Sequence, residues 1–398
     1  MSHILIIGGG PSGLRAAEVA SNAGMKVTLC DQRRSVGRKF LVAGKGGLNL
    51  THSEEIETFA TRYQGPDQPH DFWPRALADF DNKEIRAWAA RLNVGTFVQK
   101  SGRIYPKALK AAPLLRRWVE KLRKQGVDFR MSHRLVSLTS GKASFEGPEG
   151  KIEIQANAII LALGGGSWPQ TGSDGAWVET LEKAGVKVSP LAPANCGWEV
   201  AWSSDLAEQL EAKPLKNVVA SAGDKIAPGE IMITRYGMEG GPLYTLGPVL
   251  RRMDKPLLTL DFKPTFAIEK LVGKMESAKK NFLAESQYRW KLSESMRLIL
   301  DHFHGPFSSA EHLAQHAKAC RIPLTKTRPI EEAISSSGGV PWQTINDQLM
   351  IKSLPGIFVA GEMIDWEAPT GGYLLQGCFA SGTRAAEAAL AFKISKPG

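Results

Sequence analysis

The sequence predicts an α/β fold in which both ends of the chain build one Rossmann-like domain. The chain opens with a strand, a glycine turn, a helix and a second strand within about 30 residues. A later run, Ala158–Leu163, is apolar on both faces, as a central parallel strand is. A further apolar strand, Gly356–Ala360, leads into a glycine-rich loop and a helix near the C-terminus. We therefore infer that the two chain ends meet in one nucleotide-binding domain.

The other elements of this domain follow from hydrophobic periodicity and from turn residues. The further strands that we expect are Ile4–Ile7, Lys26–Cys30, Phe129–Leu138, Lys142–Glu146 and Lys151–Gln155. The helices that we expect are Ser12–Ala23, Ala111–Gln125 and Gln376–Phe392. Gly24 and Gly126 follow the first two helices, where glycine is a common terminator.

The pattern of strand-like and helix-like segments changes at about Val186, which predicts an insertion. Residues 187–262 are rich in strand patterns, whereas residues 265–320 are mainly helical. We expect a Rossmann-like FAD-binding domain from 1–186 and 335–398, a β-rich domain from 187–262 and 321–334, and a small helical domain from 263–320. The insertion is expected to carry the surface that faces the substrate.

The first turn carries a dinucleotide-binding pattern, because Gly8–Gly13 fits G-x-G-x-x-G between a strand and a helix. Gly8 permits the tight turn, Gly10 lets the backbone approach a pyrophosphate, and Gly13 lets the helix pack closely on the strand. The helix N-terminus then offers its amides to the phosphates. Asp31, at the end of the second strand, is the acid that we expect to bind ribose hydroxyls.

The C-terminal part of the chain favours FAD over NAD as the bound dinucleotide. Gly361 and Glu362 follow a strand, and this arrangement would place a carboxylate near a cofactor's polyol. The next helix N-terminus would lie near a ring that becomes anionic, as a reduced flavin does. The sequence shows no second G-x-G-x-x-G, so NAD(P)H, if it is the electron donor, is expected to dock transiently.

Charge and composition limit the partners and the compartment. The 43% hydrophobic and 23% charged residues are typical of a globular protein. There is no cationic leader and no apolar run of membrane-span length, so we expect a cytoplasmic protein without a membrane contact. The net charge of +10 favours anionic ligands, and a basic loop holds Arg33, Arg34, Arg38, Lys39 and Lys45. No aromatic-interleaved basic motif stands out, so a small-molecule substrate is favoured over nucleic acid. The sequence sets no oligomeric state.

The cysteines and histidines predict no metal site and no redox dithiol. Cys30, Cys196, Cys320 and Cys378 are far apart and form no C-x-x-C pair, which suits a reducing compartment. His302 and His304 would lie on different faces of a helix. Cys378 follows the glycine loop, and we expect it to be packed rather than reactive.

Several motifs of the sequence resemble those of the YhiN/BaiN-type (HI-like) NAD(P)/FAD-dependent flavoproteins. The resemblance extends over essentially the whole chain, in the right order. The segments that carry it are Gly37–Leu41, Ala43–Thr51, Gly229–Thr234, Tyr236–Gly237, Gly240–Pro242, Gly338–Val340, Gly361–Asp365 and Thr370–Gln376. There are departures: the family's Gly-Arg-Cys-Asn stands here as Gly46–Asn49, without Arg and Cys, and an Asn is missing from Gly371–Gln376. The chain therefore looks like a divergent branch.

The resemblance implies an FAD-dependent oxidoreductase with the three-part architecture described above. It implies that Gly8, Gly10, Ser12 and Gly13 hold the pyrophosphate, that Asp31 holds the adenosine ribose, and that Arg38, Lys39 and Asn49 line the route to the flavin. It further implies that Glu362 meets the ribityl chain and that Gly372, Tyr373 and Leu374 meet the pyrimidine edge. The set of residues expected at the cofactor is completed by Pro11, Gln32, Leu135, Ala162, Gly164, Gly361 and Gly371.

The leading functional hypothesis is an oxidoreductase that transfers electrons or hydride through a non-covalently bound FAD. Two alternatives stay open. One is an FAD-dependent enzyme that modifies RNA, which the positive charge favours. The other is a non-catalytic sensor of flavin or nucleotide, because a fold does not by itself decide a function. No catalytic acid or base is identified from the sequence.

Overall fold

The computed structural model describes residues 2–44 and 46–392, so Lys45 of the predicted basic loop lies outside the described residues. The chain forms two compact units, one from Met1–Ala192 with Ser335–Gly398 and the other from Pro193–Ile334. Each unit has its own hydrophobic core.

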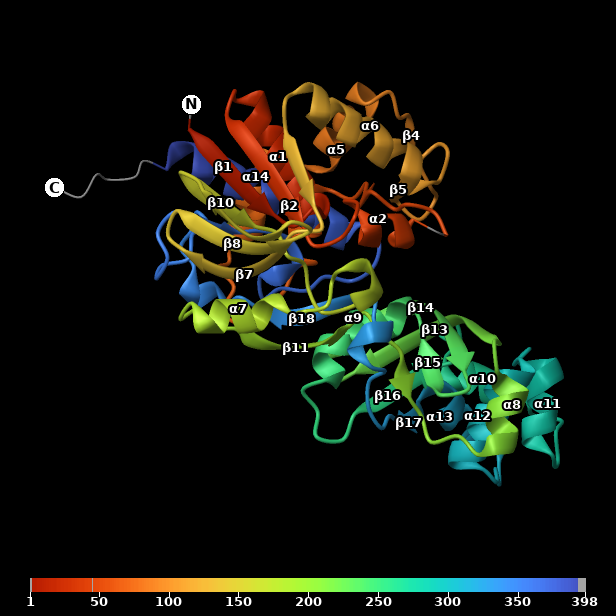
Figure 1. Cartoon of the computed structure of the whole chain (residues 1–398). Helices are drawn as coiled ribbons and strands as arrows, with labels where there is room; N and C mark the ends of the chain where they lie inside the picture. Colours follow the sequence, from red (N-terminus) through yellow and green to blue (C-terminus); the bar gives the residue numbers. More distant parts are fainter. Residues whose placement is uncertain (1, 45, 393–398) are drawn as a thin grey trace. The chain divides into compact units, whose positions relative to one another are not determined.

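The first unit is built on a five-stranded parallel sheet to which both chain ends contribute (Figure 1). Its strand order is β19-β10-β1-β2-β6, and every neighbouring pair is parallel. The strands are β1 (His3–Ile7), β2 (Lys26–Asp31), β6 (Asp128–Met131), β10 (Ala158–Leu161) and β19 (Ile357–Val359). The predicted α/β class, with a Rossmann-like domain from both chain ends, is confirmed.

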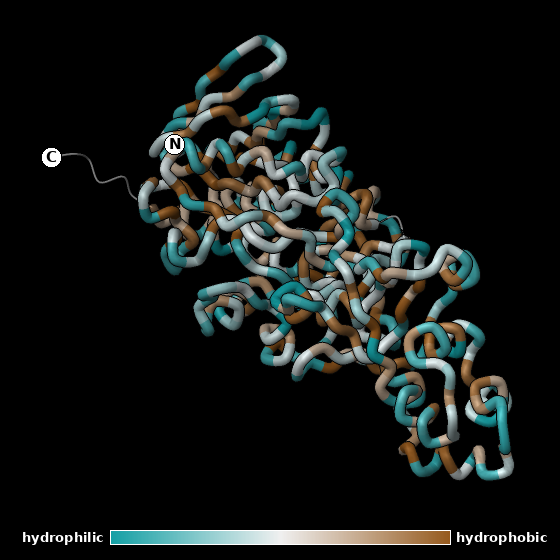
Figure 2. Tube along the Cα trace, turned by 90° about the horizontal axis from the view of Figure 1, so that it is seen from below, coloured by the Kyte–Doolittle hydropathy of each residue, from teal (hydrophilic) through white to brown (hydrophobic). Residues whose placement is uncertain are grey.

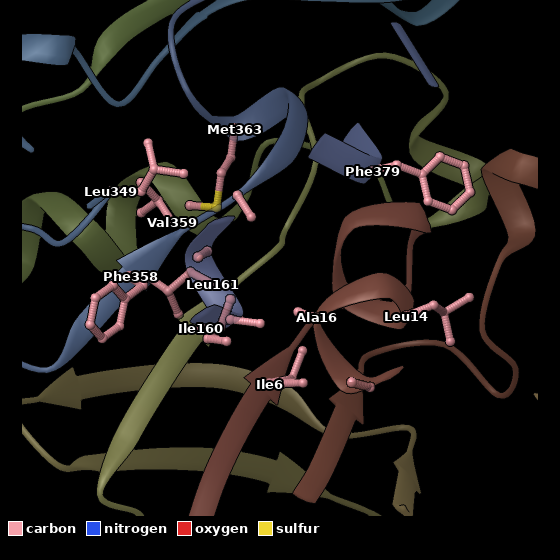
Figure 3. Packing of buried hydrophobic residues seen from close by; sticks show 14 of the residues in the cluster. Ile6, Leu14, Ala16, Ile160, Leu161, Leu349, Phe358, Val359, Met363 and Phe379 are labelled. Atoms are coloured by element: carbon pink, nitrogen blue, oxygen red, sulfur yellow. The ribbon is translucent and has the colours of Figure 1, made fainter. Parts of the chain in front are cut away.

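Helices α1 (Pro11–Asn22) and α14 (Tyr373–Ala391) pack against this sheet and against each other. Their backbones approach closely, because a Cβ added to Gly382 would lie 2.5 Å from the carbonyl oxygen of Ser12. Figure 3 shows side chains from β1, β10 and β19 beside residues of both helices. The labelled residues there include Ile6, Leu14, Ile160, Val359 and Phe379, all essentially buried.

The strand predicted over 129–138 is two strands in the structure. After β6 the backbone adopts a left-handed conformation at Ser132, with φ of 60°, and the amide of His133 bonds to the carbonyl oxygen of Asp31. The chain thereby leaves the parallel sheet and starts a separate antiparallel sheet. The strands of that sheet are β7 (Arg134–Thr139), β8 (Lys142–Gly147) and β9 (Gly150–Gln155).

The rest of the first unit surrounds the parallel sheet. A small antiparallel sheet has the order β3-β5-β4, and β11 pairs with β18. These strands are β3 (Thr51–His52), β4 (Thr96–Val98), β5 (Arg103–Pro106), β11 (Ser189–Ala194) and β18 (Ser335–Gly339). The further helices are α2 (Arg38–Ala43), α3 (Ile56–Ala60), α4 (Phe72–Asp79), α5 (Asn82–Arg91), α6 (Ala111–Lys124) and α7 (Trp177–Lys183).

The second unit is a six-stranded antiparallel sheet with helices packed on it, in the order β12-β15-β14-β13-β16-β17. The strands are β12 (Trp198–Glu199), β13 (Pro214–Ala222), β14 (Lys225–Thr234), β15 (Gly237–Glu239), β16 (Leu257–Asp261) and β17 (Cys320–Pro323). The helices are α8 (Ser204–Leu210), α9 (Gly241–Leu250), α10 (Ile268–Lys274), α11 (Phe282–Arg289), α12 (Glu294–His304) and α13 (Ala310–Lys318).

The sequence predicted two parts within this insertion, a β-rich one and a helical one. In the structure the helices and the sheet share one hydrophobic core, which includes Leu260 of β16, Leu271 of α10 and Ala317 of α13. The amide of Phe262 also bonds to the carbonyl oxygen of Ala317. Short amphipathic helices cannot bury their apolar faces alone, so they complete the core of the adjacent sheet.

Figure 2 shows hydrophobic residues along the interior segments and hydrophilic residues on many outer turns. Of the helices within the described ranges, none combines the length and the apolar character that crossing a bilayer requires.

Candidate cofactor site

A cavity of about 380 Å³ lies in the first unit, where β1, β2 and β10 end. From β1 the chain continues to β2 and β6 on one side, and it later adds β10 and β19 on the other. Such a reversal of strand order is where open parallel sheets bind ligands. The predicted cofactor residues that line this cavity are Gly8, Gly10, Pro11, Ser12, Asp31, Gln32, Arg38, Lys39, Leu135, Ala162, Gly164 and Glu362.

The glycine turn after β1 has the geometry that the G-x-G-x-x-G pattern predicts. Gly8 has φ of +109°, and a Cβ there would lie 2.2 Å from the carbonyl oxygen of Ala162. A Cβ on Gly13 would lie 1.9 Å from the carbonyl oxygen of Gly8. At Gly10, in contrast, no atom of the described residues beyond its immediate chain neighbours lies within 4 Å of the Cβ position. Gly8 and Gly13 are therefore required by the fold, whereas Gly10 keeps the backbone open toward the cavity.

Asp31 ends β2 with both carboxylate oxygens engaged. Its Oδ2 accepts the amide hydrogen of Gly9 and its Oδ1 accepts that of Arg33, each over 2.7 Å. Burial raises the pKa of Asp31. These two bonds orient the carboxylate toward the glycine turn. Because each carboxylate oxygen accepts more than one hydrogen bond, both can still receive ribose hydroxyls.

Two buried polar atoms at the cavity have no partner within the part of the chain that the structure describes. They are the hydroxyl oxygen of Ser173 and the indole nitrogen of Trp177, and both residues line the cavity. Buried polar atoms are normally hydrogen-bonded. A nucleotide offers hydroxyl and phosphate oxygens that could bond to them, so these residues fit a dinucleotide.

Lys39 and Glu362 form an ion pair on the cavity wall. The Lys39 ammonium lies 2.7 Å from Glu362 Oε2 and donates to the Ser167 hydroxyl over 2.7 Å. Glu362 Oε1 also accepts the amide hydrogen of Ser336 over 2.9 Å. The two charged side chains are 26% and 13% exposed, so water screens the pair only partly. Gly361, which precedes this acid, has φ of +79° and packs against Ser12.

The remaining predicted residues form a second group, which does not line this cavity. They are Gly13, Asn49, Gly361, Gly371, Gly372, Tyr373 and Leu374. Most of this group lies where β3 meets the start of α14. The Thr51 hydroxyl donates to Gln376 Oε1 over 2.7 Å, and Gln376 Nε2 donates to the carbonyl oxygen of Phe80. Gly372 has φ of +100°, and its Cβ position is only 2.5 Å from Thr51 Cα.

The side chains of this second group differ in whether they have a polar atom that is available to a ligand. The Tyr373 ring packs within the protein, stacked on His52 at 5.5 Å and edge-on to Phe59 at 4.8 Å. Burial raises the pKa of Tyr373. Asn49 Oδ1, in contrast, is buried and has no hydrogen-bond partner among the described residues. Asn49 and the α14 N-terminus are therefore the parts of this group that suit a polar ligand.

Sequence reasoning missed part of the cavity wall. Ser173, Trp177 and His133 line it, as does Cys378, which the sequence predicted to be packed. Burial raises the pKa of Cys378 to about 11. Ser173 follows a glycine-rich segment after the apolar strand β10, and that position was the available signal. Within residues 2–44 and 46–392, no three His, Cys, Asp or Glu side chains are grouped so that they could hold a metal ion.

Comparison with known proteins identifies relatives over almost the whole chain. The HI0933-like protein Rossmann domain model matches residues 2–388. The 3-dehydro-bile acid delta(4,6)-reductase of Clostridium scindens is 28% identical over 416 residues, which cover 98% of this chain and 99% of the relative. The ribosomal RNA dihydrouridine synthase of Escherichia coli is 22% identical over 412 residues, covering 98% of each.

Solved structures agree with the fold. The 3-ketosteroid-delta4-(5alpha)-dehydrogenase from Rhodococcus jostii RHA1 has a TM-score of 0.54 at 12% identity, covering 98% of this chain and 97% of that one. Identity this low supports the fold alone. The family match is far broader than a single motif, and it includes the turn, the acid after β2 and the C-terminal glycine loop. The chain therefore belongs to the HI0933-like Rossmann-domain family of FAD-dependent flavoproteins.

Proposed function

We propose that this protein is a flavin-dependent reductase that saturates a carbon–carbon double bond conjugated to a carbonyl group. Two relatives support this reaction class, because one is named as a delta(4,6)-reductase of a 3-dehydro-bile acid and the other as a dihydrouridine synthase. Saturating such bonds adds a hydride to the electron-poor carbon and a proton to its neighbour. The bound flavin would supply the hydride.

The observation that carries the proposal is the cavity at the ends of β1, β2 and β10. In this proposal the turn from Gly8 holds the pyrophosphate and Asp31 holds the adenosine ribose. The Lys39–Glu362 pair orients the polyol. Asn49 and the N-terminus of α14 would meet the flavin ring, where positive helix-end potential favours the negative charge of the reduced state. A nicotinamide nucleotide would dock transiently as the donor.

The test is the absorbance spectrum of the purified protein, recorded anaerobically before and after NADH or NADPH. Flavin bands that bleach with a nicotinamide are expected. The reduced protein is then mixed with cyclohexenone, a steroid 4-en-3-one or a uridine-rich RNA, and with cyclohexanone as the matched saturated ketone. Reoxidation by at least one conjugated acceptor, with the saturated product found by mass spectrometry, supports the proposal. A reducible flavin that none of the three reoxidises overturns it and favours a sensor.

A further inference from the structure

Three histidine rings meet in the second unit, where α12, α13 and β17 pack together (Figure 1). The ring of His304, the last residue of α12, is stacked on that of His316 in α13, with centroids 4.2 Å apart and an interplanar angle of 21°. His312, one turn earlier in α13, has its ring centroid 5.0 Å from that of His316. We call His304, His312 and His316 the imidazole cluster.

The imidazole cluster is partly shielded from water. Phe307, from the turn between the two helices, lies against it, with its ring centroid 5.5 Å from that of His312 and 6.1 Å from that of His316. His302, in contrast, is exposed, and its ring lies beside Trp202, with 6.3 Å between centroids. His302 therefore belongs to the same helix as His304 but not to the cluster.

One ring of the cluster makes a hydrogen bond that decides its protonation state. The backbone amide of Arg321, in β17, donates to Nε2 of His304 over 3.1 Å. Nε2 accepts this bond only without a proton, so His304 is neutral and carries its hydrogen on Nδ1. The bond ties the end of α12 to β17, the last strand in the order of the six-stranded sheet. A proton on Nε2 would replace the acceptor by a donor and break this tie.

The charged groups around the cluster do not compensate a positive charge on it. The charged neighbours that act most strongly on His304 are His316, His312 and Arg321, and none of these is acidic. The acids of the neighbouring elements are exposed or already paired with a cation. They are Asp301 of α12, Glu311 of α13 and Glu269 of α10, all exposed, Asp261 of β16, paired with Lys318, and Glu285 of α11, paired with Arg289. The further cations there are Lys270 and Lys274 of α10, which lie over the Phe266 ring.

Two effects on protonation oppose each other at the cluster. His304 and His316 each lie in the last turn of a helix, where the helix dipole favours a cation. Burial outweighs this effect: it is the main cause that lowers the pKa of His304 from 6.5, followed by the neighbouring His316. Burial likewise lowers the pKa of His316, followed by the neighbouring His312. Because the unfolded chain then binds these protons more readily than the folded one, acid favours opening.

We propose that the imidazole cluster is an acid-sensitive switch, which joins α12 and α13 to β17 while it is neutral and releases β17 when it gains protons. The contribution to stability is complete above about pH 6.5 and is lost as the pH falls below that value. The first unit has a hydrophobic core of its own, so we expect it to keep FAD while β17 opens. Stacked rings suit a switch better than a metal site, because their nitrogen lone pairs lie in the ring planes and do not converge on one ion. The switch does not involve the flavin and goes beyond the proposed function.

Cys320 reports on the opening of β17, because it is the first residue of that strand and is 0% exposed. The test measures how fast dithiodipyridine, which also reacts with thiols in acid, labels Cys320 in the FAD-loaded protein between about pH 5.5 and pH 7.5. Dividing this rate by the rate for urea-unfolded protein at the same pH gives the open fraction. Cys30, in β2 and also 0% exposed, is the reference for the first unit. Mass spectrometry of peptides identifies the labelled thiol.

We expect the open fraction at Cys320 to rise as the pH falls below about 6.5, by up to about tenfold per pH unit for each histidine that takes up a proton. Labelling of Cys30 should stay slow, and FAD should stay bound. His304→Gln/His316→Gln removes both titrating rings and keeps an acceptor for the Arg321 amide, so its open fraction should be nearly independent of pH. His302→Gln is the matched control and should keep the pH dependence of the parent.

An open fraction at Cys320 that does not change with pH in the parent overturns the proposal, as does a pH dependence that persists in the double variant. Equal opening at Cys30 and Cys320 also overturns it, because the whole protein then unfolds. Thermal melting at about pH 7.5 shows whether the double variant is folded. If it is not, the parent is titrated by nuclear magnetic resonance of its histidine ring hydrogens, assigned with the single variants. Titration of His304 and His316 below about pH 6.5 supports the proposal, and titration at or above that pH overturns it.

Discussion

Lys39 and Glu362 lie 2.7 Å apart although 323 positions separate them in the chain. Lys39 comes from α2, near the N-terminus, and Glu362 comes from the turn that follows the last strand, β19. The pair closes the cavity wall from two sides, and it does so with side chains that water screens only partly. It is therefore a contact through which the two chain ends meet at one cavity.

We predict that Lys39→Met weakens FAD binding about tenfold, which corresponds to ~1.4 kcal/mol. The loss leaves the Glu362 carboxylate without its cation, next to a ligand that is itself anionic. The measurement is a fluorescence titration of the apoprotein with FAD. Lys142→Met, which removes an exposed ion pair with Glu153, is the control and should change the dissociation constant little. Equal effects in the two variants would contradict a role for the Lys39–Glu362 pair.

Replacing glycine by alanine should have different effects at two positions of the glycine turn, Gly13 and Gly10. Gly13→Ala places a methyl group 1.9 Å from the Gly8 carbonyl oxygen, so it should destabilise the apoprotein by about 1–3 kcal/mol. The methyl group of Gly10→Ala would meet no atom of the described residues within 4 Å apart from its chain neighbours, and Gly10 has φ of −79°, which alanine adopts readily. We expect that variant to unfold as the parent does but to lose FAD, because the methyl group occupies the approach of the pyrophosphate. Urea unfolding and FAD titration of both variants separate the two effects.

Cys378 should react slowly with thiol reagents at neutral pH. Burial, with the Glu362 carboxylate as a further cause, raises the pKa of Cys378 to about 11, and the thiolate is the reactive form. The other cysteines are buried, whereas Cys378 is partly exposed and lines the cavity. Labelling by N-ethylmaleimide should therefore rise about tenfold for each pH unit up to about pH 10.

In the folded protein that labelling should depend on Cys378 and be slowed by FAD. Cys378→Ser is the control that removes it, and mass spectrometry of peptides identifies the labelled thiol. Rapid labelling at pH 7, or labelling that FAD does not slow, would show that the thiol lies in a different environment.

Glu18 should contribute strongly to stability. It is 1% exposed in α1, and its Oε2 accepts the indole hydrogens of Trp88 and Trp118, each over 2.9 Å, while Oε1 accepts from Lys121. Glu18→Ala leaves two buried indole donors unpaired, so we expect a loss of about 3 kcal/mol in the free energy of unfolding. Glu18→Gln keeps an acceptor for the indoles and should cost less.

The measurement is urea unfolding followed by tryptophan fluorescence. Glu120→Ala, at an exposed position of α6, is the control and should be nearly neutral. If Glu18→Ala is as mild as the control, then the indoles find other partners, and the carboxylate does not hold α5 and α6 onto α1.

The sequence by itself determined the parallel strands, the turn of Gly8–Gly13 and the acid Asp31. These features depend on short-range rules: the apolar period of a strand, the freedom of glycine and the position of a residue at a strand end. The placing of both chain ends in one domain also followed, because a second strand, glycine turn and helix recur near the C-terminus. The sequence did not predict the length of the strand after α6. The left-handed backbone at Ser132 ends that strand, and the chain continues in a different sheet.

Tertiary structure alone decided which distant residues meet. The Lys39–Glu362 pair and the Thr51–Gln376 bond join segments more than 300 positions apart, and Phe97 meets Tyr105 only through the register of β4 and β5. Ser173 and Trp177 are candidates because each has a polar atom that lies buried at the cavity without a hydrogen-bond partner among the described residues. Such contacts depend on how whole elements pack and on which groups lose water there, and neither quantity is contained in the pattern of neighbouring residues.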